Sequence, residues 1–265
     1  MTSLFNYIGK KNFDFSNVLQ VLGSTKYIEP FGGSYQAGLN TMNKENSSVK
    51  FIFNDVDLSI YLIWKEARKN IFDLVDEYYR VCKLFEGFGE FDEIMHYIDT
   101  ASTSDTNIAA CNMFLANSLR FRGGSRFDFG KDSIYKTYIT HDWFLEMLDK
   151  LPRLTLYNLD YRELLKLEDS PSVFMFIDPP YYINNTNIYY GTNCSYFYHK
   201  ELAKILSTVK ANWVLSYNDC DYINELYKDY RKLPYKYSSY RSEVYIYNFN
   251  IDERVLKEAL RMSLC

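Results

Sequence analysis

A carboxylate, two prolines and a tyrosine directly follow an apolar run at residues 173–177: Asp178, Pro179, Pro180 and Tyr181. Prolines end strands, so the run is predicted to be a buried strand with Asp178 at its carboxyl end. Asp178 could accept one N–H of a planar heterocyclic amine and the Pro179 carbonyl the other, which would free the lone pair of the nitrogen for attack. Neither proline has an N–H that competes, and Tyr181 could stack on the heterocycle. The alternative is a turn whose aspartate caps a helix.

Three other apolar runs end in residues suited to a nucleoside. Residues 29–34 form a glycine turn, Glu-Pro-Phe-Gly-Gly-Ser, in which backbone could approach a ligand closely. Asp55 follows the next run and could accept ribose hydroxyls, whereas Asp160 follows a third and could bond an adenine amine. Taken singly, the glycines fit a tight turn and each aspartate fits a helix N-cap. Their occurrence at three strand ends favours a nucleoside ligand.

The elements that must position these residues alternate between strand and helix patterns. Strands are predicted near residues 27–30, 50–55, 154–160, 173–177, 212–219 and 243–249, with helices between most of them. From residue 71 to residue 150 the pattern is mainly helical, with helices near 71–88, 107–119 and 141–151. We therefore predict a core of residues 1–70 and 151–265, with a second, helical domain of residues 71–150 inserted between its second and third strands.

Composition excludes several classes of protein. The 265 residues carry a formal net charge of -4, so any polyanion would have to bind a local basic patch. The five cysteines include no CxxC pair, which argues against a zinc site or a disulfide framework. His96, His141 and His199 lie in no metal-binding pattern and are interpreted as surface or packing residues. With no signal peptide and no membrane-spanning run, a cytoplasmic protein without a membrane partner is expected.

Taken together, these segments resemble the Dam-type DNA N6-adenine methyltransferases, in which the cofactor motif, the target-recognition domain and the DPPY motif follow in that order. The segments at residues 7–13, 27–34, 53–57, 158–164, 176–182, 213–219 and 243–249 match motifs of that family. One departure is Tyr35, where the family usually has a small residue after Gly-Gly-Ser. The resemblance implies an α/β fold: a Rossmann-like methyltransferase mixed sheet with an inserted, mainly helical target-recognition domain.

The resemblance also implies S-adenosyl-L-methionine (AdoMet) as cofactor, with no metal. Tyr7 and Lys11 would hold its methionine end, with Lys11 facing the carboxylate. Asp55 would accept the ribose hydroxyls. The cofactor-binding residues implied in this way are Tyr7, Lys11, Glu29, Phe31, Gly32, Gly33, Asp55, Asp160 and Tyr161. The catalytic residues would be Asp178, Pro179, Pro180 and Tyr181, which hold the target base.

A hairpin near residues 117–131, with glycines at its tip, would supply the contact with double-stranded DNA. By resemblance, Asn117 and Arg120 would read base edges, each contact discriminating by about 1–3 kcal/mol. Arg122, Arg126 and Lys131 would contact phosphates, which set the register. The target base would be flipped out of the duplex and enclosed by a tyrosine-rich loop that includes Tyr182, Tyr189, Tyr190 and Tyr196. A monomer or a weak dimer on DNA is expected.

Three alternatives stay open at this stage. The same chemistry at Asp178 would serve the 4-amino group of cytosine or an adenine in RNA. A catalytically silent DNA-binding homologue would keep the fold without turnover. The absence of a Pro-Cys nucleophile motif argues against methylation of a cytosine ring carbon. The target sequence, and membership of a restriction-modification system or a virus, are left undecided.

Overall fold

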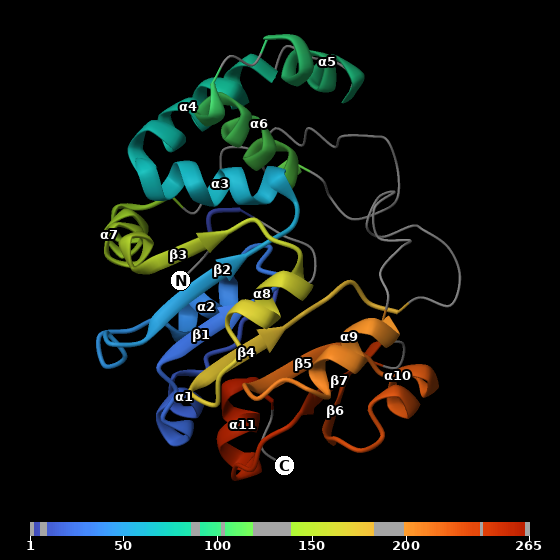
Figure 1. Ribbon diagram of the computed structural model, residues 1–265. Helices are drawn as coiled ribbons and strands as arrows, with labels where there is room; N and C mark the ends of the chain where they lie inside the picture. Colours follow the sequence, from blue (N-terminus) through green and yellow to red (C-terminus); the bar gives the residue numbers. More distant parts are fainter. Residues whose placement is uncertain are drawn as a thin grey trace.

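The computed structural model describes residues 3–5, 10–85, 91–101, 104–118, 139–182, 199–238 and 241–262 (Figure 1). Its centre is a seven-stranded sheet of order β3-β2-β1-β4-β5-β7-β6. The strands are β1 Lys26–Glu29, β2 Lys50–Asn54, β3 Leu154–Tyr157, β4 Val173–Ile177, β5 Asn212–Asn218, β6 Arg231–Ser238 and β7 Arg241–Tyr247. Strands β1 to β5 are parallel, and β7 is antiparallel to both β5 and β6. This arrangement agrees with the Rossmann-like mixed sheet expected from the sequence.

Helices connect most of the strands, and four of those described begin at a side-chain cap. The side chains of Asp57, Thr140, Asp160 and Asp252 each accept a backbone N–H at the start of a helix, as N-cap residues do. The helices are α1 Ser16–Leu22, α2 Gln36–Thr41, α3 Leu58–Lys69, α4 Ile71–Phe85, α5 Phe91–Ala101, α6 Asp105–Ser118, α7 His141–Lys150, α8 Tyr161–Leu167, α9 His199–Leu206, α10 Asp221–Leu226 and α11 Glu253–Ala259, with a 3₁₀ turn at Leu151–Arg153.

Strand β4 shows why the sheet is covered on both faces. All five of its residues are buried, and successive side chains point to opposite sides. Phe174 and Phe176 join one buried cluster, to which α1, α2, α3 and α11 contribute. Met175 and Ile177 join the other, to which α8, α9 and α10 contribute. A parallel sheet packed in this way fixes the positions of its strand ends.

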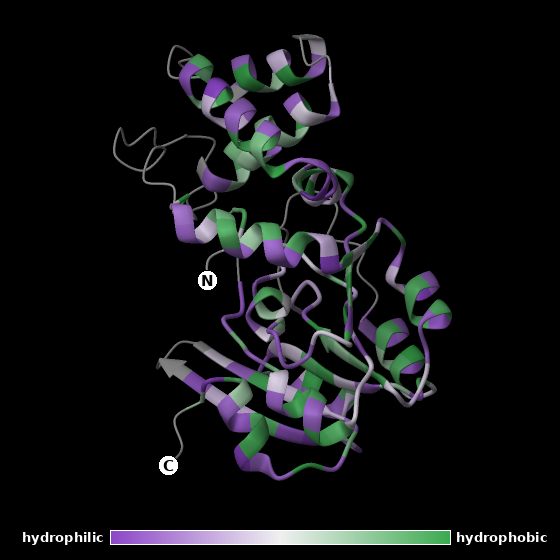
Figure 2. Cartoon of the chain, turned by 90° about the vertical axis from the view of Figure 1, so that its left-hand side faces the viewer, coloured by the Kyte–Doolittle hydropathy of each residue, from purple (hydrophilic) through white to green (hydrophobic). Residues whose placement is uncertain are grey.

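The helical segment leaves the sheet after β2 and returns at β3. These two strands are neighbours, with Phe51 opposite Leu154, so the segment enters and leaves at one side of the sheet. Helices α4 to α6 lie at the top of the molecule beyond α3, and hydrophilic and hydrophobic residues alternate along them (Figures 1 and 2). One buried cluster runs from the sheet through Trp64 to Phe85 and Phe114. The division into two domains stays a prediction.

Two elements were missed by the sequence patterns. Helix α5 was not predicted, and neither was β6, which contains Pro234. Proline removes a ladder donor and is tolerated at a sheet edge, where β6 lies. The hairpin near residues 117–131 lies almost wholly outside the described residues. In the part of the chain that the structure describes, every helix is too short or too polar to cross a bilayer.

Candidate active site

The predicted site residues gather at the carboxyl ends of β1, β2, β3 and β4. Strand β1 lies between β2 and β4, which is where the strand order changes direction. In open α/β sheets, ligands bind outside the strand ends at such a switch point. The register aligns Glu29 with Phe53 and Asn54 with Tyr157, so the segments after these strands emerge at the same edge.

The glycine turn after β1 is fastened to the end of β2. The Gly33 N–H donates to Asp55 Oδ2 at 2.9 Å, and the Asp57 N–H donates to Asp55 Oδ1 at 2.9 Å. A Cβ on Gly32 would lie 2.4 Å from the Phe53 ring, so no larger residue fits there without displacement. Burial raises the pKa of Asp55 to about 6, although both N–H donors act in the opposite direction. Each carboxylate oxygen keeps room for a second donor, such as a ribose hydroxyl.

Asn54 ties three of the strand-end segments together. Its Nδ2 donates to the carbonyls of Pro30 and Leu159, at 2.8 and 3.0 Å, and its Oδ1 accepts the Leu159 N–H at 2.9 Å. The sequence reasoning missed this role. A buried amide that bonds two loops produces no pattern of hydrophobic spacing in the sequence. The only hint was that Asn54 directly precedes Asp55.

Tyr35, the departure from the family pattern, turns its ring into the core. It has a φ of 51° at the start of α2 and is fully buried. Its ring packs edge-on against Phe53 and Trp64, at centroid distances of 5.5 and 6.0 Å. Gly38 leaves room for it, since a Cβ there would lie 2.4 Å from the ring. The extra volume is therefore absorbed beneath the glycine turn.

Two aromatic rings border the edge beside Asp160. Phe31 and Tyr161 lie 5.3 Å apart between centroids, tilted by 36°. Asp160 caps α8, and its two oxygens accept Arg162 Nε and Nη2, both at 2.7 Å. These bonds hold the pKa of Asp160 below its usual value. A nucleobase amine would therefore share this carboxylate with a guanidinium.

Glu29 is a buried carboxyl at the end of β1. Burial raises its pKa to about 8, opposed by hydrogen bonds from the Tyr27 hydroxyl, at 2.8 Å, and from the Gly38 N–H. The charge of Asp178 raises it further. Burial therefore favours the protonated form of this carboxyl, and a nearby cation would favour its ionisation.

The Asp178 end of the site combines one open acceptor with a dense network of polar contacts. Asp178 Oδ1 is buried and has no hydrogen-bond partner among the described residues. The Tyr181 hydroxyl lies 2.7 Å from Ser216 Oγ on β5 and accepts from Lys11 Nζ at 2.7 Å. Lys11 also forms an ion pair with Glu243 at 2.6 Å. Burial raises the pKa of Asp178 to about 6, and the charge of Lys11 opposes that rise.

Ser216 and Glu243 were not predicted as site residues. Each lies inside a strand that reads as an ordinary sheet element, and only the fold brings it to Tyr181 or Lys11. Glu243 follows two polar residues, Arg241 and Ser242, and its sequence position gave no signal of a site role.

Aromatic residues continue the site beyond Tyr181. Tyr182 stacks on Tyr222 at 4.2 Å, and its carbonyl accepts from Asn218 Nδ2 at 2.9 Å. His199 Nδ1 lies 2.8 Å from the Tyr217 hydroxyl, and burial lowers the pKa of His199 to about 4. The packing role expected for His199 agrees with these contacts.

Several predicted residues lie outside the described part of the chain: Tyr7, Arg120, Arg122, Arg126, Lys131, Tyr189, Tyr190 and Tyr196. Asn117 is described at the end of α6, where its Nδ2 donates to the Tyr78 hydroxyl at 3.1 Å. Of the two residues predicted to read bases, Asn117 is therefore held against α4 by its bond to Tyr78, and Arg120 lies outside the described residues.

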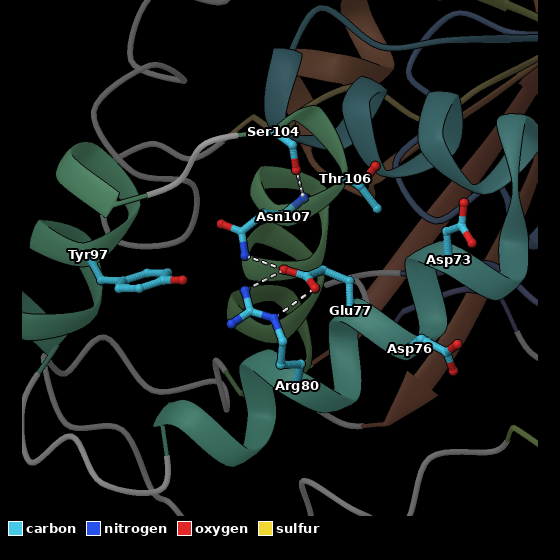
Figure 3. Close-up of a pocket in the computed structure, with 8 residues that line it drawn as sticks. All are labelled: Asp73, Asp76, Glu77, Arg80, Tyr97, Ser104, Thr106 and Asn107. Carbon is cyan, nitrogen blue, oxygen red and sulfur yellow. Dashed lines mark hydrogen bonds and ion pairs between the residues drawn. The ribbon is translucent and has the colours of Figure 1, made fainter.

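An open, polar hollow lies elsewhere, between α4, α5 and the start of α6 (Figure 3). At its centre, Glu77 accepts from both Arg80 and Asn107. Arg80 offsets the charge of Glu77, and none of the predicted cofactor or catalytic residues lines the hollow. Across the described ranges, no group of three or more His, Cys, Asp or Glu residues could hold a metal ion.

A 3-2-1-4-5-7-6 sheet, with the predicted cofactor and catalytic residues at its switch point, is consistent with the class of Rossmann-like methyltransferases. A model of the D12 class N6 adenine-specific DNA methyltransferases matches residues 7–242, and the chain belongs to that family. It is therefore an AdoMet-dependent enzyme that methylates adenine in DNA. A comparison with curated proteins found no match.

Proposed function

We propose that the enzyme methylates the 6-amino group of an adenine that is flipped out of double-stranded DNA, at a specific sequence, and held by Asp178 and Tyr181. The observation that carries this proposal is the buried Asp178 Oδ1, an acceptor without a partner among the described residues. An unpaired buried acceptor is costly unless a ligand pairs it. Flipping the adenine out of the duplex costs roughly a few kcal/mol, because the base loses its stacking contacts.

The residues at the switch point fit the cofactor. Asp55 has acceptor capacity left for the ribose, Phe31 and Tyr161 offer faces for the adenine, and Glu29 offers a carboxyl for the positive end. We propose these roles together with those of Gly32, Gly33, Asp160 and Tyr7. When bound, AdoMet supplies a methyl group made electrophilic by its sulfonium.

The donors of Lys11 are already in use within the protein. Its ammonium group has three N–H donors, and three oxygens already accept them: both of Glu243 and that of Tyr181. A contact with the methionine carboxylate would require the exchange of one of these bonds. Lys11 therefore acts mainly at the Tyr181 side of the site.

The reaction needs the amine to leave planarity. Asp178 accepts one N–H and the Pro179 carbonyl the other, which favours the tetrahedral nitrogen that attacks the methyl group. Tyr181 stacks on the base, and its hydroxyl contacts with Lys11 and Ser216 limit its rotation. Fixed acceptors of this kind stabilise the transition state without reorganisation.

On the DNA side, Asn117 and Arg120 are proposed to read bases, and Arg122, Arg126 and Lys131 to contact phosphates. Residues 71–150 would be the target-recognition domain, and one copy, or a weak dimer, would act on each site. Because the substrate is DNA, the expected place of action is the cytoplasm of a bacterium or of a virus-infected cell.

Replacing Arg120 by alanine is expected to reduce discrimination between preferred and altered target sequences by about 10-fold or more, since each base contact contributes about 1–3 kcal/mol. AdoMet affinity should stay as in the wild type. Methylation rates on duplexes that differ at one base pair measure the effect. Arg122→Ala is the matched control: it should weaken binding to all sequences alike and reduce the salt dependence. Unchanged sequence preference in Arg120→Ala would rule out base reading.

Glu29 should make AdoMet affinity depend on pH. Only the ionised carboxylate attracts the sulfonium, and its pKa is raised to about 8, so wild-type affinity should rise as the pH increases from 6.5 to 8.5. Glu29→Gln should lose this increase. Titration calorimetry at several pH values compares the two, and the difference between them cancels the ionisation of the cofactor itself. Parallel pH profiles would exclude the role.

The proposed function is tested with AdoMet carrying a tritiated methyl group. Purified protein is incubated with duplex DNA, duplex RNA or single-stranded DNA, and labelled nucleosides are separated after digestion. Label in N6-methyladenine from duplex DNA alone supports the proposal. Label in N4-methylcytosine or in RNA would establish one of the alternative substrates. Tight DNA binding with no incorporation of label under any condition would identify the protein as a catalytically silent DNA-binding homologue.

A further inference from the structure

Lys11 sits in a closed set of contacts at the edge of the target-base site. Its Nζ lies 2.6 and 2.7 Å from the two oxygens of Glu243, and 2.7 Å from the Tyr181 hydroxyl. The side chains of Lys11 and Glu243 are 8% and 12% exposed, so water screens this pair weakly. The pair joins two segments 232 residues apart in the chain.

Glu243 is held in place by the sheet. It lies on β7 directly opposite Asn218 of β5, and its Oε2 accepts the Tyr245 hydroxyl at 2.9 Å. Tyr245 in turn packs edge-on against Phe13 at 5.5 Å. The carboxylate therefore meets Lys11 from a rigid strand, and the direction of the Lys11 N–H bonds follows from it.

Lys11 donates to the hydroxyl of Tyr181, which follows Asp178 by three residues, and the charge of the Lys11 ammonium favours the ionised form of Asp178. Asp178 Oδ1 has no partner among the described residues, and Lys11 donates to Glu243 and Tyr181. An ammonium released from Glu243 could pair with the Asp178 carboxylate instead. An ion pair there would occupy the acceptor that the target amine needs.

We propose that Glu243 is a positioning residue, which holds the Lys11 ammonium against the Tyr181 hydroxyl and thereby keeps it from pairing with Asp178. This inference rests on the proposed function of Asp178. It gives Glu243 two effects on the reaction: Tyr181 is kept in one orientation, and the Asp178 carboxylate stays open for the N–H of the base.

The charge around Asp178 makes the proposal measurable. The groups that face it come from the N-terminal segment, β1, the segment after β4, β5 and β7, and they are Lys11, Glu29, Tyr181, Ser216, Tyr217 and Glu243. Lys11 favours its ionised form, and Glu243 disfavours it. Removing the Glu243 charge alone should therefore move the acid limb of the pH–rate profile to lower pH.

Glu243→Gln is the first variant, because it keeps the shape and one acceptor oxygen. At its pH optimum we expect methyl transfer to be slowed by about 10-fold or more, the usual scale for one misplaced polar group at a reacting centre. The acid limb should fall by about one pH unit as Lys11 turns to Asp178. Single-turnover rates from pH 4.5 to 7.5 give both values, and circular dichroism confirms that the variant is folded.

Adding Lys11→Met to Glu243→Gln separates positioning from simple loss of structure. Without the Lys11 ammonium, no cation pairs with Asp178, so methyl transfer by the double variant should be no slower than by Glu243→Gln. The pH midpoint of its acid limb should equal or exceed that of the wild type. Tyr245→Phe is the matched control. It removes one hydroxyl from the same cluster without a change of charge, and its acid limb should stay within about 0.3 units of the wild type, against the shift expected for a lost charge.

Two results would overturn the proposal in an active wild-type enzyme: an acid limb that stays or rises in Glu243→Gln, or rate losses that multiply in the double variant. An inactive wild-type protein would instead refute the proposed function itself, so the two failures are distinguishable.

Discussion

Methyl transfer is expected to slow by about 10³-fold when Asp178 is replaced by alanine, the scale seen when one preorganised group of a transition-state site is removed. Alanine offers no acceptor for the N–H of the target amine, which would stay planar and weakly nucleophilic. AdoMet binding should be retained, because Asp55 and the glycine turn are untouched. Single-turnover assays with saturating cofactor measure the rate, and titration calorimetry measures the affinity. Asp178→Asn, which keeps one oxygen, should be slowed less than Asp178→Ala.

Asp178→Ala should lower the rate of methyl transfer without lowering the stability of the folded protein. The folded-state pKa of Asp178 is raised from 3.8 to about 6 by burial, so the folded protein holds this proton more tightly than the unfolded chain. Between these values the free energy of unfolding falls as the pH rises, and above about 6 the full cost of the buried charge is present. Asp178→Ala removes that cost, so its melting temperature at pH 7.5 should equal or exceed that of the wild type.

Asp169 provides the control for this experiment. It lies before the other end of β4, where its Oδ1 accepts the N–H groups of Lys210 and Ala211. Asp169→Ala should lower the melting temperature and leave the rate per folded molecule unchanged. An Asp178→Ala rate within tenfold of the wild type would show that the target amine is held by other groups.

Replacing Asp55 by alanine is expected to weaken AdoMet binding by about 100-fold or more, because hydrogen bonds to a charged group contribute about 1.5–3 kcal/mol each. The variant loses the ribose acceptor and also the bonds that fix the Gly33 and Asp57 N–H groups. The glycine turn would then have to be ordered by the cofactor. Titration calorimetry measures the affinity, and thermal unfolding with and without AdoMet should show a smaller shift than in the wild type.

The matched control for Asp55 is two residues further along the same turn. Asp57 caps α3 by accepting the Ser59 N–H at 2.8 Å. Asp57→Ala should cost about 1 kcal/mol of stability, as the loss of an N-cap does, and leave AdoMet affinity unchanged. Equal affinities of Asp55→Ala and the wild type would remove Asp55 from the cofactor site.

The parts of the fold that follow local rules could be predicted from the sequence. The runs at β1, β2, β4 and β5 are apolar and end in turn or cap residues, so their positions and their shared edge followed from patterns alone. Strand β6 could not be predicted, because Pro234 and the basic residues Arg231, Lys232 and Lys236 read as a loop until a neighbouring strand is present. The direction of the Tyr35 ring depended on Gly38, a packing relation that no spacing rule reveals.

The same distinction holds for the site. Asp55 and Asp178 were predictable because each is the first residue after an apolar strand. The Lys11–Glu243 pair joins the N-terminal segment to β7, and its direction toward Tyr181 depends on the order of β5 and β7 in the sheet. Sequence motifs specified which chemistry is available, and long-range packing decided which donor meets which acceptor.

Helix α3 has a consequence for how specificity in this enzyme could diversify. Its Trp64 indole donates to the Gly33 carbonyl at 3.0 Å, and the same helix packs against α4 and α6. In a chimaera that exchanged only residues 71–150 with a relative, α3 would pack against helices of a different sequence. A shift of α3 caused by this poorer packing would move the Trp64 indole, and with it the Gly33 carbonyl of the glycine turn. A chimaera should therefore fold and bind cofactor better when α3 is exchanged together with residues 71–150. New sequence specificities should arise more readily by substitution of exposed residues than by exchange of the whole segment.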